Sequence, residues 1–169
     1  MRKEKRKKQP KRKPLDLKTI TACLGGAACG LLVTAAGQLQ TKEAEPFIHT
    51  LNRPLPLPPL WVFLLCWALF FLLTGMVTGY IAIKKTAGKK KRLALLCLQM
   101  LLPHLWPLCT FKIGSLELAL LAALLLLVLT VQNAIALFKA GKKAFYLHLY
   151  CPVFILFATL LTAFFMWLN

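Results

Sequence analysis

Five stretches of this chain are almost free of charge over the length that crosses a lipid bilayer. An apolar helix of about 20 residues spans the hydrocarbon core, and backbone groups in lipid must find their hydrogen bonds within that helix. The chain is also 59% apolar, where soluble domains contain about half. The pattern predicts an all-α membrane protein, a bundle of five transmembrane helices. The expected spans are residues 19–41, 60–83, 93–111, 115–138 and 144–168.

The basic residues predict how this bundle is oriented. Residues 1–18 form a basic tail with ten Lys and Arg, and the second and fourth connections carry six and three more. The first and third connections carry two and one. Because positive loops stay inside, we expect a cytoplasmic tail at 1–18, a membrane domain at 19–169 and a C-terminus outside.

The net charge of +17 is compatible with nucleic-acid binding in principle. Its placement at alternate span ends instead indicates a topology signal and an anchor to anionic lipid. We therefore expect the lipid bilayer and no nucleic acid as a partner. The expected location is a bacterial cell membrane, crossed several times.

Small residues form a stripe along the first span, at Ala22, Gly26, Gly30 and Thr34. Such a stripe lets another helix approach closely. One alternative is that it docks other membrane proteins, so that the chain is a scaffold. A second is that the span is a signal peptide, since a basic head precedes it, although its uncharged run is long for one.

Prolines and glycines predict where the helices are interrupted. Residues 42–59 are rich in Pro, which favours an extended connection. Pro103 and Pro107 predict a kink in the third span. Lys112 and Gly114 predict a tight turn after it.

Enzyme and metal signatures are weak. The six Cys form no C-x-x-C pair and no zinc spacing, which favours buried, reduced thiols. No pair of acidic residues, no Ser/His/Asp set and no nucleotide-binding fingerprint occurs. We therefore assign no catalytic residue and no metal ligand.

Residues 51–75 carry the most distinctive motif. A basic residue precedes Pro, and a Pro-Pro pair precedes Trp-Val-Phe and a second Trp. This segment resembles the TspO/MBR family, the translocator or tryptophan-rich sensory proteins, which have five transmembrane helices. The matching residues are Arg53, Pro54, Pro58, Pro59, Trp61, Val62, Phe63, Trp67 and Gly75, followed by Gln99, Trp106, Phe157-Ala158-Thr159 and Leu168-Asn169.

Several polar positions of the family pattern are replaced. Pro103 takes the place of an Asn, and Cys151 takes the place of a Tyr. Phe154 stands for a Trp and Thr162 for an Asn. Ligand contacts that the family makes through that Asn and Tyr are therefore not carried over.

The resemblance implies a ligand and a pocket. Family members bind porphyrins, haem and related tetrapyrroles or other apolar molecules, with no cofactor required. It implies a sensor, carrier or regulator, and it allows a homodimer. The implied ligand-binding residues are Arg53, Trp61, Phe63, Trp67, Gln99, Trp106, Phe154 and Phe157. Aromatic faces stack on a macrocycle, Arg53 suits a propionate, and a polar residue such as Gln99 faces the protein interior.

Other roles remain open for these residues. Trp61 also fits an interface anchor, Trp67 ordinary packing and Gln99 a bond to a neighbouring helix. His104 is a conceivable but less favoured axial haem ligand. Two alternative functions are light- or oxygen-dependent porphyrin breakdown through Trp67, and a membrane scaffold without a ligand.

Overall fold

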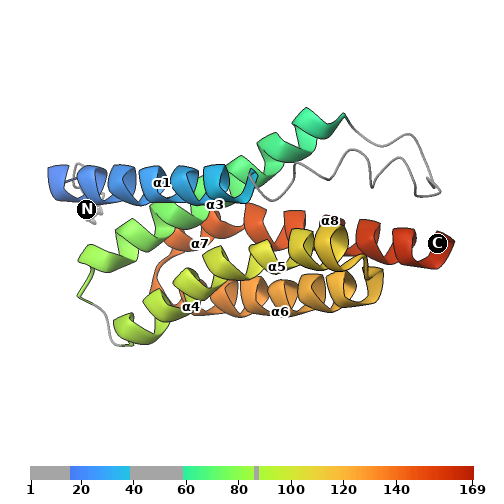
Figure 1. Cartoon of the computed structure of the whole chain (residues 1–169). Coiled ribbons are helices and arrows are strands. Elements are labelled where there is room, and N and C mark those ends of the chain that lie inside the picture. Colours follow the sequence, from blue (N-terminus) through green and yellow to red (C-terminus); the bar gives the residue numbers. More distant parts are fainter. Residues whose placement is uncertain (1–15, 39–58, 86–87) are drawn as a thin grey trace, which may run out of the picture.

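Five helical stretches of the chain are long and apolar enough to cross a membrane. The computed structural model describes residues 16–38, 59–85 and 88–169, and these are helical apart from short connections (Figure 1). The all-α five-helix membrane bundle predicted from the sequence is confirmed. The elements are α1 (Leu17–Gln38), α3 (Leu60–Ile83), α4 (Lys89–Leu101), η2 (Leu102–His104), α5 (Leu105–Pro107), η3 (Leu108–Ile113), α6 (Leu116–Ala140), α7 (Lys142–His148) and α8 (Tyr150–Leu168).

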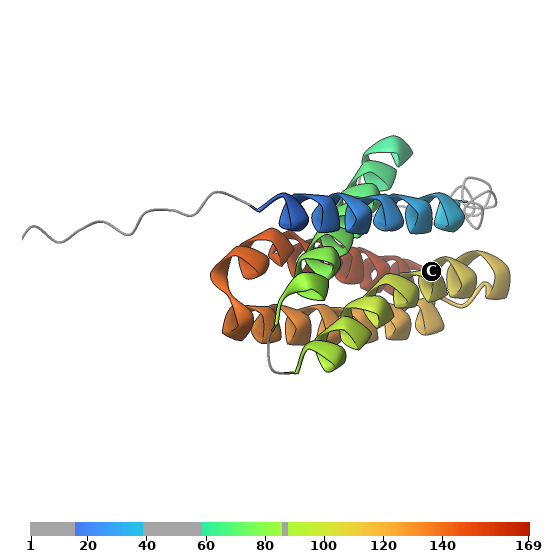
Figure 2. The same cartoon turned by 90° about the vertical axis from the view of Figure 1, so that its left-hand side faces the viewer.

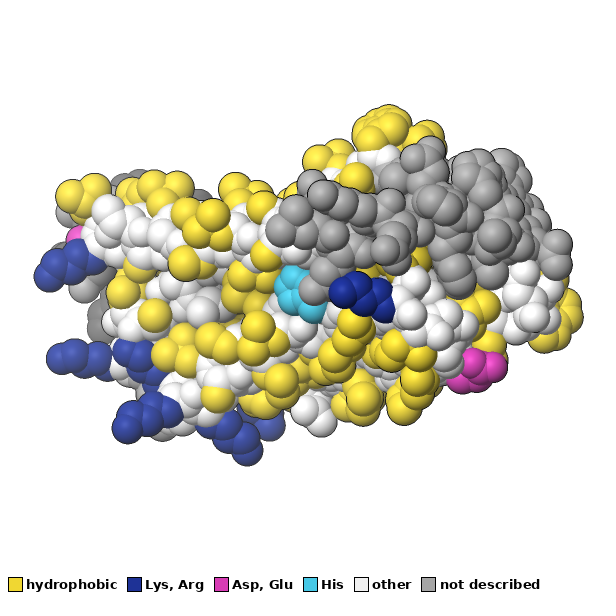
Figure 3. Space-filling model, viewed as in Figure 1, with side chains coloured by type: hydrophobic (Ala, Val, Ile, Leu, Met, Phe, Trp, Pro, Cys, Tyr) yellow, Lys and Arg dark blue, Asp and Glu magenta, His cyan; other side chains and the backbone are white. Residues whose placement is uncertain are grey.

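The bundle has one basic end. Helix α1 begins and α8 ends at opposite ends of the bundle, as an odd number of spans requires (Figure 1). The dark blue side chains of Figure 3 gather where α1 and α4 begin and where α3 and α6 end. Within the described ranges, only Lys112 departs from this pattern, because it lies in η3 at the other end of its span. The apolar surface between the ends is what a bilayer would cover.

The third span changes its helical form at its prolines. Pro103 has no N–H to donate, and the chain tightens into the 3-10 turn η2 at this point. The π-helical η3 follows and ends at Gly114, which has φ 71°. The α-helix is therefore interrupted where the sequence predicts a kink, and the predicted turn at Gly114 is confirmed. Ser115 then caps α6, because its Oγ accepts the Leu118 N–H at 3.2 Å.

A second break, in the fifth span, was not predicted. Helix α7 ends at His148 and α8 begins at Tyr150. Pro152 lacks the N–H that would bond the His148 carbonyl four residues earlier. At the break itself, the Leu149 N–H bonds the Tyr146 carbonyl at 3.4 Å, three residues back, as in a 3-10 turn. Pro152 was visible in the sequence, but it was not weighed as a breaker.

Glycines join α1 to α3 by direct backbone contact. A Cβ atom on Gly26 would collide with the carbonyl of Gly75, and one on Gly79 would collide with that of Ala22. Gly30 faces the Phe71 carbonyl in the same way. Helix α1 lies along the outside of the bundle with α3 crossing it (Figure 2). The predicted close approach is confirmed, but the partner is α3 of the same chain. In the structure, α3 therefore covers the glycines of this stripe, and docking of another protein stays an untested alternative.

Two apolar clusters fill the interior. The first gathers around Phe70, Phe71, Met100, Leu126, Cys151, Phe154 and Ile155. The second gathers, nearer the basic end, around Val77, Ile81, Leu96, Leu137 and Ala144. Each cluster draws on four of the five spans, and the first span contributes little to either.

Substituting the two adjacent glycines of α1 tests the backbone contact. Gly26→Ala should lower the free energy of unfolding by about 1–3 kcal/mol, because its methyl group meets the Gly75 carbonyl. Gly25 has nothing within 4 Å of a Cβ, so Gly25→Ala should leave stability unchanged or raise it by at most about 1 kcal/mol. Unfolding by dodecyl sulfate in mixed micelles, followed by circular dichroism, measures both. Equal effects of the two substitutions would refute the contact.

Candidate functional site

A fully buried amide lies at the middle of the bundle. The Gln99 Nε2 donates to Thr74 Oγ1 at 3.1 Å, and the Gln99 Oε1 accepts from Asn133 Nδ2 at 2.7 Å. The same oxygen lies 3.1 Å from His148 Nε2. All four side chains are at most 2% exposed. One side chain thus links α3, α4, α6 and α7, as expected for a polar group inside a span.

These residues form a polar layer between the two apolar clusters. On α3, Thr74 lies between Phe71 of the first cluster and Val77 of the second. On the fifth span, His148 lies between Ala144 and Cys151 in the same way. The Cys151 Sγ is 3.5 Å from Thr74 Oγ1, so α8 also contacts the layer. We call Thr74, Gln99, Asn133, His148 and Cys151 the polar layer.

The hydrogen bonds of the layer set the tautomer of His148. Because an amide oxygen only accepts, His148 Nε2 must carry the hydrogen that points at Gln99 Oε1. The His148 Nδ1 is then an acceptor, and it is buried without a hydrogen-bond partner in the described part of the chain. The described part of the chain therefore leaves one polar atom of the layer without a partner, which is uncommon for a buried polar atom.

Four aromatic rings from three helices meet on the side of the layer away from the basic end. Phe63 and Trp67 come from α3, Trp106 from α5 and Phe154 from α8. The centroids of Trp67 and Phe154 are 5.1 Å apart at an interplanar angle of 86°. Phe63 lies 6.2–6.3 Å from each of the other three. We call these four residues the aromatic cluster; Phe154 is buried, and the other three are half-buried.

Hydrogen bonds and stacking hold the cluster in place. The Trp106 Nε1 donates to Thr162 Oγ1 at 3.0 Å. Tyr150 stacks on Phe154 at 5.7 Å and 7°, and its hydroxyl donates to the Cys66 carbonyl at 3.2 Å. Thr162 stands where the family pattern has an Asn, and it still supplies an acceptor. The rings therefore have fixed orientations.

The structure brings together four of the eight residues implied by the resemblance. Gln99 belongs to the polar layer instead. Trp61 and Phe157 are 65% and 49% exposed and lie outside the cluster. Arg53 lies outside the described residues. None of these placements tests ligand binding, so the ligand-binding assignments remain predictions.

The His104 ring packs against neighbouring helices and is not part of the aromatic cluster. Its ring stacks on Phe71 with centroids 5.7 Å apart at 22°, and it lies close to Gly37 of α1. In the described ranges, no group of three or more His, Cys, Asp or Glu side chains comes together as a metal site would require. The described part therefore offers no multidentate metal centre.

Sequence analysis missed most of the polar layer. The sequence patterns do not single out Thr74, Asn133 or His148. The signal was present, because an Asn in the middle of a Leu-rich span is costly unless it is bonded. Its neighbour Gln132 is exposed to the lipid side, so the residue type alone does not show which of the two faces inward.

Comparison with known protein families gives a match over nearly the whole chain. The sequence model of the TspO/MBR family matches residues 22–168, nearly the whole chain. The match includes the polar layer and the aromatic cluster. A search of curated proteins gave no significant match.

The two glutamines test the polar layer. Gln99→Leu should lower the free energy of unfolding by about 2 kcal/mol, because it removes hydrogen bonds to three helices and leaves their partners buried. Gln132→Leu makes the same chemical change on the exposed side of α6 and should alter stability by less than about 0.5 kcal/mol. Dodecyl sulfate unfolding in mixed micelles measures both. A Gln99 variant as stable as the Gln132 variant would show that the layer does not join the helices.

Proposed function

The chain belongs to the TspO/MBR family, and from that membership we propose that it binds a flat apolar ligand of the tetrapyrrole class, a porphyrin or haem, at the aromatic cluster. The carrying observation is that Phe63, Trp67, Trp106 and Phe154, which three helices supply, converge at one place. In this role the chain is a membrane sensor, carrier or regulator, and the ligand is a regulatory or transported molecule and not a required cofactor.

The spacing of the rings indicates how a macrocycle would bind. Two stacking contacts of about 3.5 Å each need rings about 7 Å apart. The centroid of Phe63 lies 6.2–6.3 Å from those of the other three rings, and Trp67 lies 5.1 Å from Phe154, so a ligand does not fit between the rings of these pairs. A tetrapyrrole therefore stacks on the half-buried outer faces of Phe63, Trp67 and Trp106. We call these outer faces the platform; one side of it packs on the protein, and the other faces water or lipid.

The aromatic cluster is supported by buried side chains beneath it. Buried Phe70 packs edge-on against Trp67 at 5.5 Å, and the Cys151 Sγ lies 4.0 Å from the Phe70 carbonyl. The platform thus rests on the first apolar cluster and, through Cys151, on the polar layer. Preorganised aromatic faces cost little entropy when a ligand binds. Arg53, in the segment before α3, is the residue we propose to pair with a propionate.

Haem titration of the full-length protein in detergent tests the platform. Trp67→Ala should raise the Kd for haem by about tenfold, since it removes a stacking face together with its edge contact to Phe154. Phe63→Ala should act in the same direction. Trp167 is 76% exposed at the end of α8 and is a matched control, so Trp167→Ala should leave the Kd unchanged. The shift of the Soret band measures haem binding by the unaltered protein and by the three variants.

Two results would contradict the proposal. One is the absence of any Soret shift for the unaltered protein at micromolar haem. The other is an equal loss of affinity in the Trp67 and Trp167 variants, which would place the ligand away from the cluster. Circular dichroism of each variant shows that it has kept its helices.

We also propose that the basic end faces the cytoplasm, as the positive-inside rule expects. All but one of the described Lys and Arg lie at that end, near the start of α1. A fluorescent protein fused before residue 1 should then fluoresce, and an alkaline phosphatase fused after Asn169 should be active outside the cytoplasm. Both reporters signalling the same compartment would refute this orientation.

A further inference from the structure

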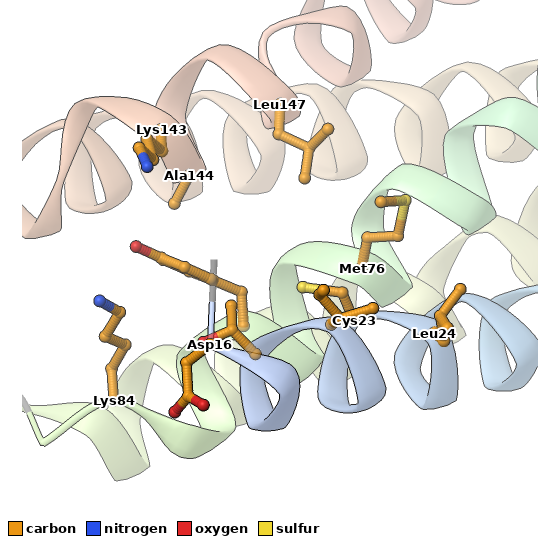
Figure 4. A pocket seen from close by; sticks show the side chains of 11 residues that line it. Asp16, Cys23, Leu24, Met76, Lys84, Lys143, Ala144 and Leu147 are labelled. Carbon is orange, nitrogen blue, oxygen red and sulfur yellow. The ribbon is translucent and has the colours of Figure 1, made fainter. Parts of the chain in front are cut away.

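A cavity of about 500 Å³ opens at the basic end of the bundle, between α1, α3 and α7 (Figure 4). It lies against the second apolar cluster, to which Ala144 of its lining belongs, on the opposite side of the polar layer from the aromatic cluster. Its size falls in the range of ligand sites. The residues that line it are Asp16, Thr19, Ile20, Cys23, Leu24, Met76, Tyr80, Lys84, Lys143, Ala144 and Leu147.

The cavity is charged at its mouth and apolar in its depth. Lys84, at the end of α3, and Lys143, in the first turn of α7, lie on opposite sides of the opening (Figure 4). The Lys84 Nζ lies 4.9 Å from the centre of the Tyr80 ring, a contact that holds its ammonium group at the mouth. Met76 and Leu147 lie farther in, along the helices (Figure 4).

The position of this cavity matches a membrane–water boundary. Lys84 directly follows the apolar helix α3, and Lys143 stands at the start of the last span. Such a site meets lipid headgroups at its mouth and lipid chains along its apolar walls. An occupant should therefore carry a negative charge and a hydrocarbon chain.

We propose that this cavity binds one anionic phospholipid. Its phosphate lies between the Lys84 and Lys143 ammonium groups, and an acyl chain runs along Ile20, Leu24, Met76 and Leu147. Basic pockets between helices at the positive side of a membrane protein recognise such headgroups. Asp16 lies on the same rim and is the one acidic side chain of the described lining, so the two lysines leave the rim with a net positive charge.

Other occupants fit this chemistry less well. The preceding residues 1–13 carry nine Lys and Arg and one Glu, and they are repelled by a positive rim. A second copy inserted in the same orientation presents its own basic end to the same side of the membrane, and this positive end is repelled by the positive rim of the cavity. A tetrapyrrole would find a single aromatic side chain, Tyr80, among the described lining, which gives little stacking.

The test compares two pairs of lysines in the full-length protein. Purified protein in a zwitterionic detergent is titrated with short-chain phosphatidylglycerol, and binding is followed by calorimetry and native mass spectrometry. Lys84→Gln with Lys143→Gln should raise the Kd about thirtyfold. Lys90→Gln with Lys91→Gln removes the same charge from exposed positions of α4 outside the cavity, and it should raise the Kd about threefold at most.

Three further arms identify the ligand and separate this site from the aromatic cluster. Phosphatidylcholine with the same chains should bind at least tenfold more weakly than phosphatidylglycerol. Inorganic phosphate at millimolar concentration should not displace the lipid. Cys23→Phe, which fills the apolar wall, should weaken lipid binding and leave the Kd for haem unchanged, so failure here is distinguishable from failure of the tetrapyrrole proposal.

Specific outcomes would overturn the inference. An equal loss in the two lysine pairs would mean diffuse attraction to a basic surface. Equal affinity for phosphatidylglycerol and phosphatidylcholine would show that the two lysines do not select a negatively charged headgroup. Displacement of the lipid by inorganic phosphate would make the site one for a free anion. The lysine substitutions are at exposed positions, and unchanged circular dichroism and melting temperature exclude unfolding as their cause.

Discussion

The hydrogen bonds of Gln99 determine how four of the five spans fit together. Helices in lipid gain little from apolar burial, since lipid chains are as apolar as Leu, and therefore packing and interhelical hydrogen bonds decide their register. The Gln99 amide reaches Thr74, Asn133 and His148 at once. Rotating α6 by one residue would turn Asn133 through about 100° and leave it in hydrocarbon. A polar layer of this kind specifies one arrangement among many apolar ones.

Helix α1 is attached by a different interaction. It meets α3 through Gly26 and Gly75, where backbone touches backbone, and most of its remaining surface faces outward. The position of α1 on α3 is therefore specified by close backbone packing and not by hydrogen bonds between side chains. Beside this contact, Cys23 and Leu24 of α1 help to line the cavity that opens toward α7. The same glycines that fix α1 thus leave room for a ligand beside it.

The features that sequence predicts best here are those that lipid imposes on any chain. Span number, the charged end and the interruption of the helix at Pro103 follow from local chemistry, and each agrees with the structure. The partner of the glycine stripe and the inward direction of Asn133 depend on which helices are neighbours, and no local pattern contains that information. The structure brings Phe63, Trp67 and Trp106 of the motif together, whereas Trp61 and Phe157 lie on exposed faces, because a motif does not distinguish inward from outward faces of a helix.

Helix α3 connects the two proposed binding sites. Phe63 belongs to the aromatic cluster and Lys84 to the mouth of the cavity, and an α-helix separates them by about 31 Å. Between them, Thr74 is bonded to Gln99 and Gly75 lies against Gly26, so a shift of α3 along its axis would break both contacts. Because the two sites are this far apart and share no partner residue, the free-energy effects of substitutions at one site and at the other are expected to add. Coupling between ligand and lipid would require two discrete positions of α3, and the contacts at Thr74 and Gly75 hold it in one.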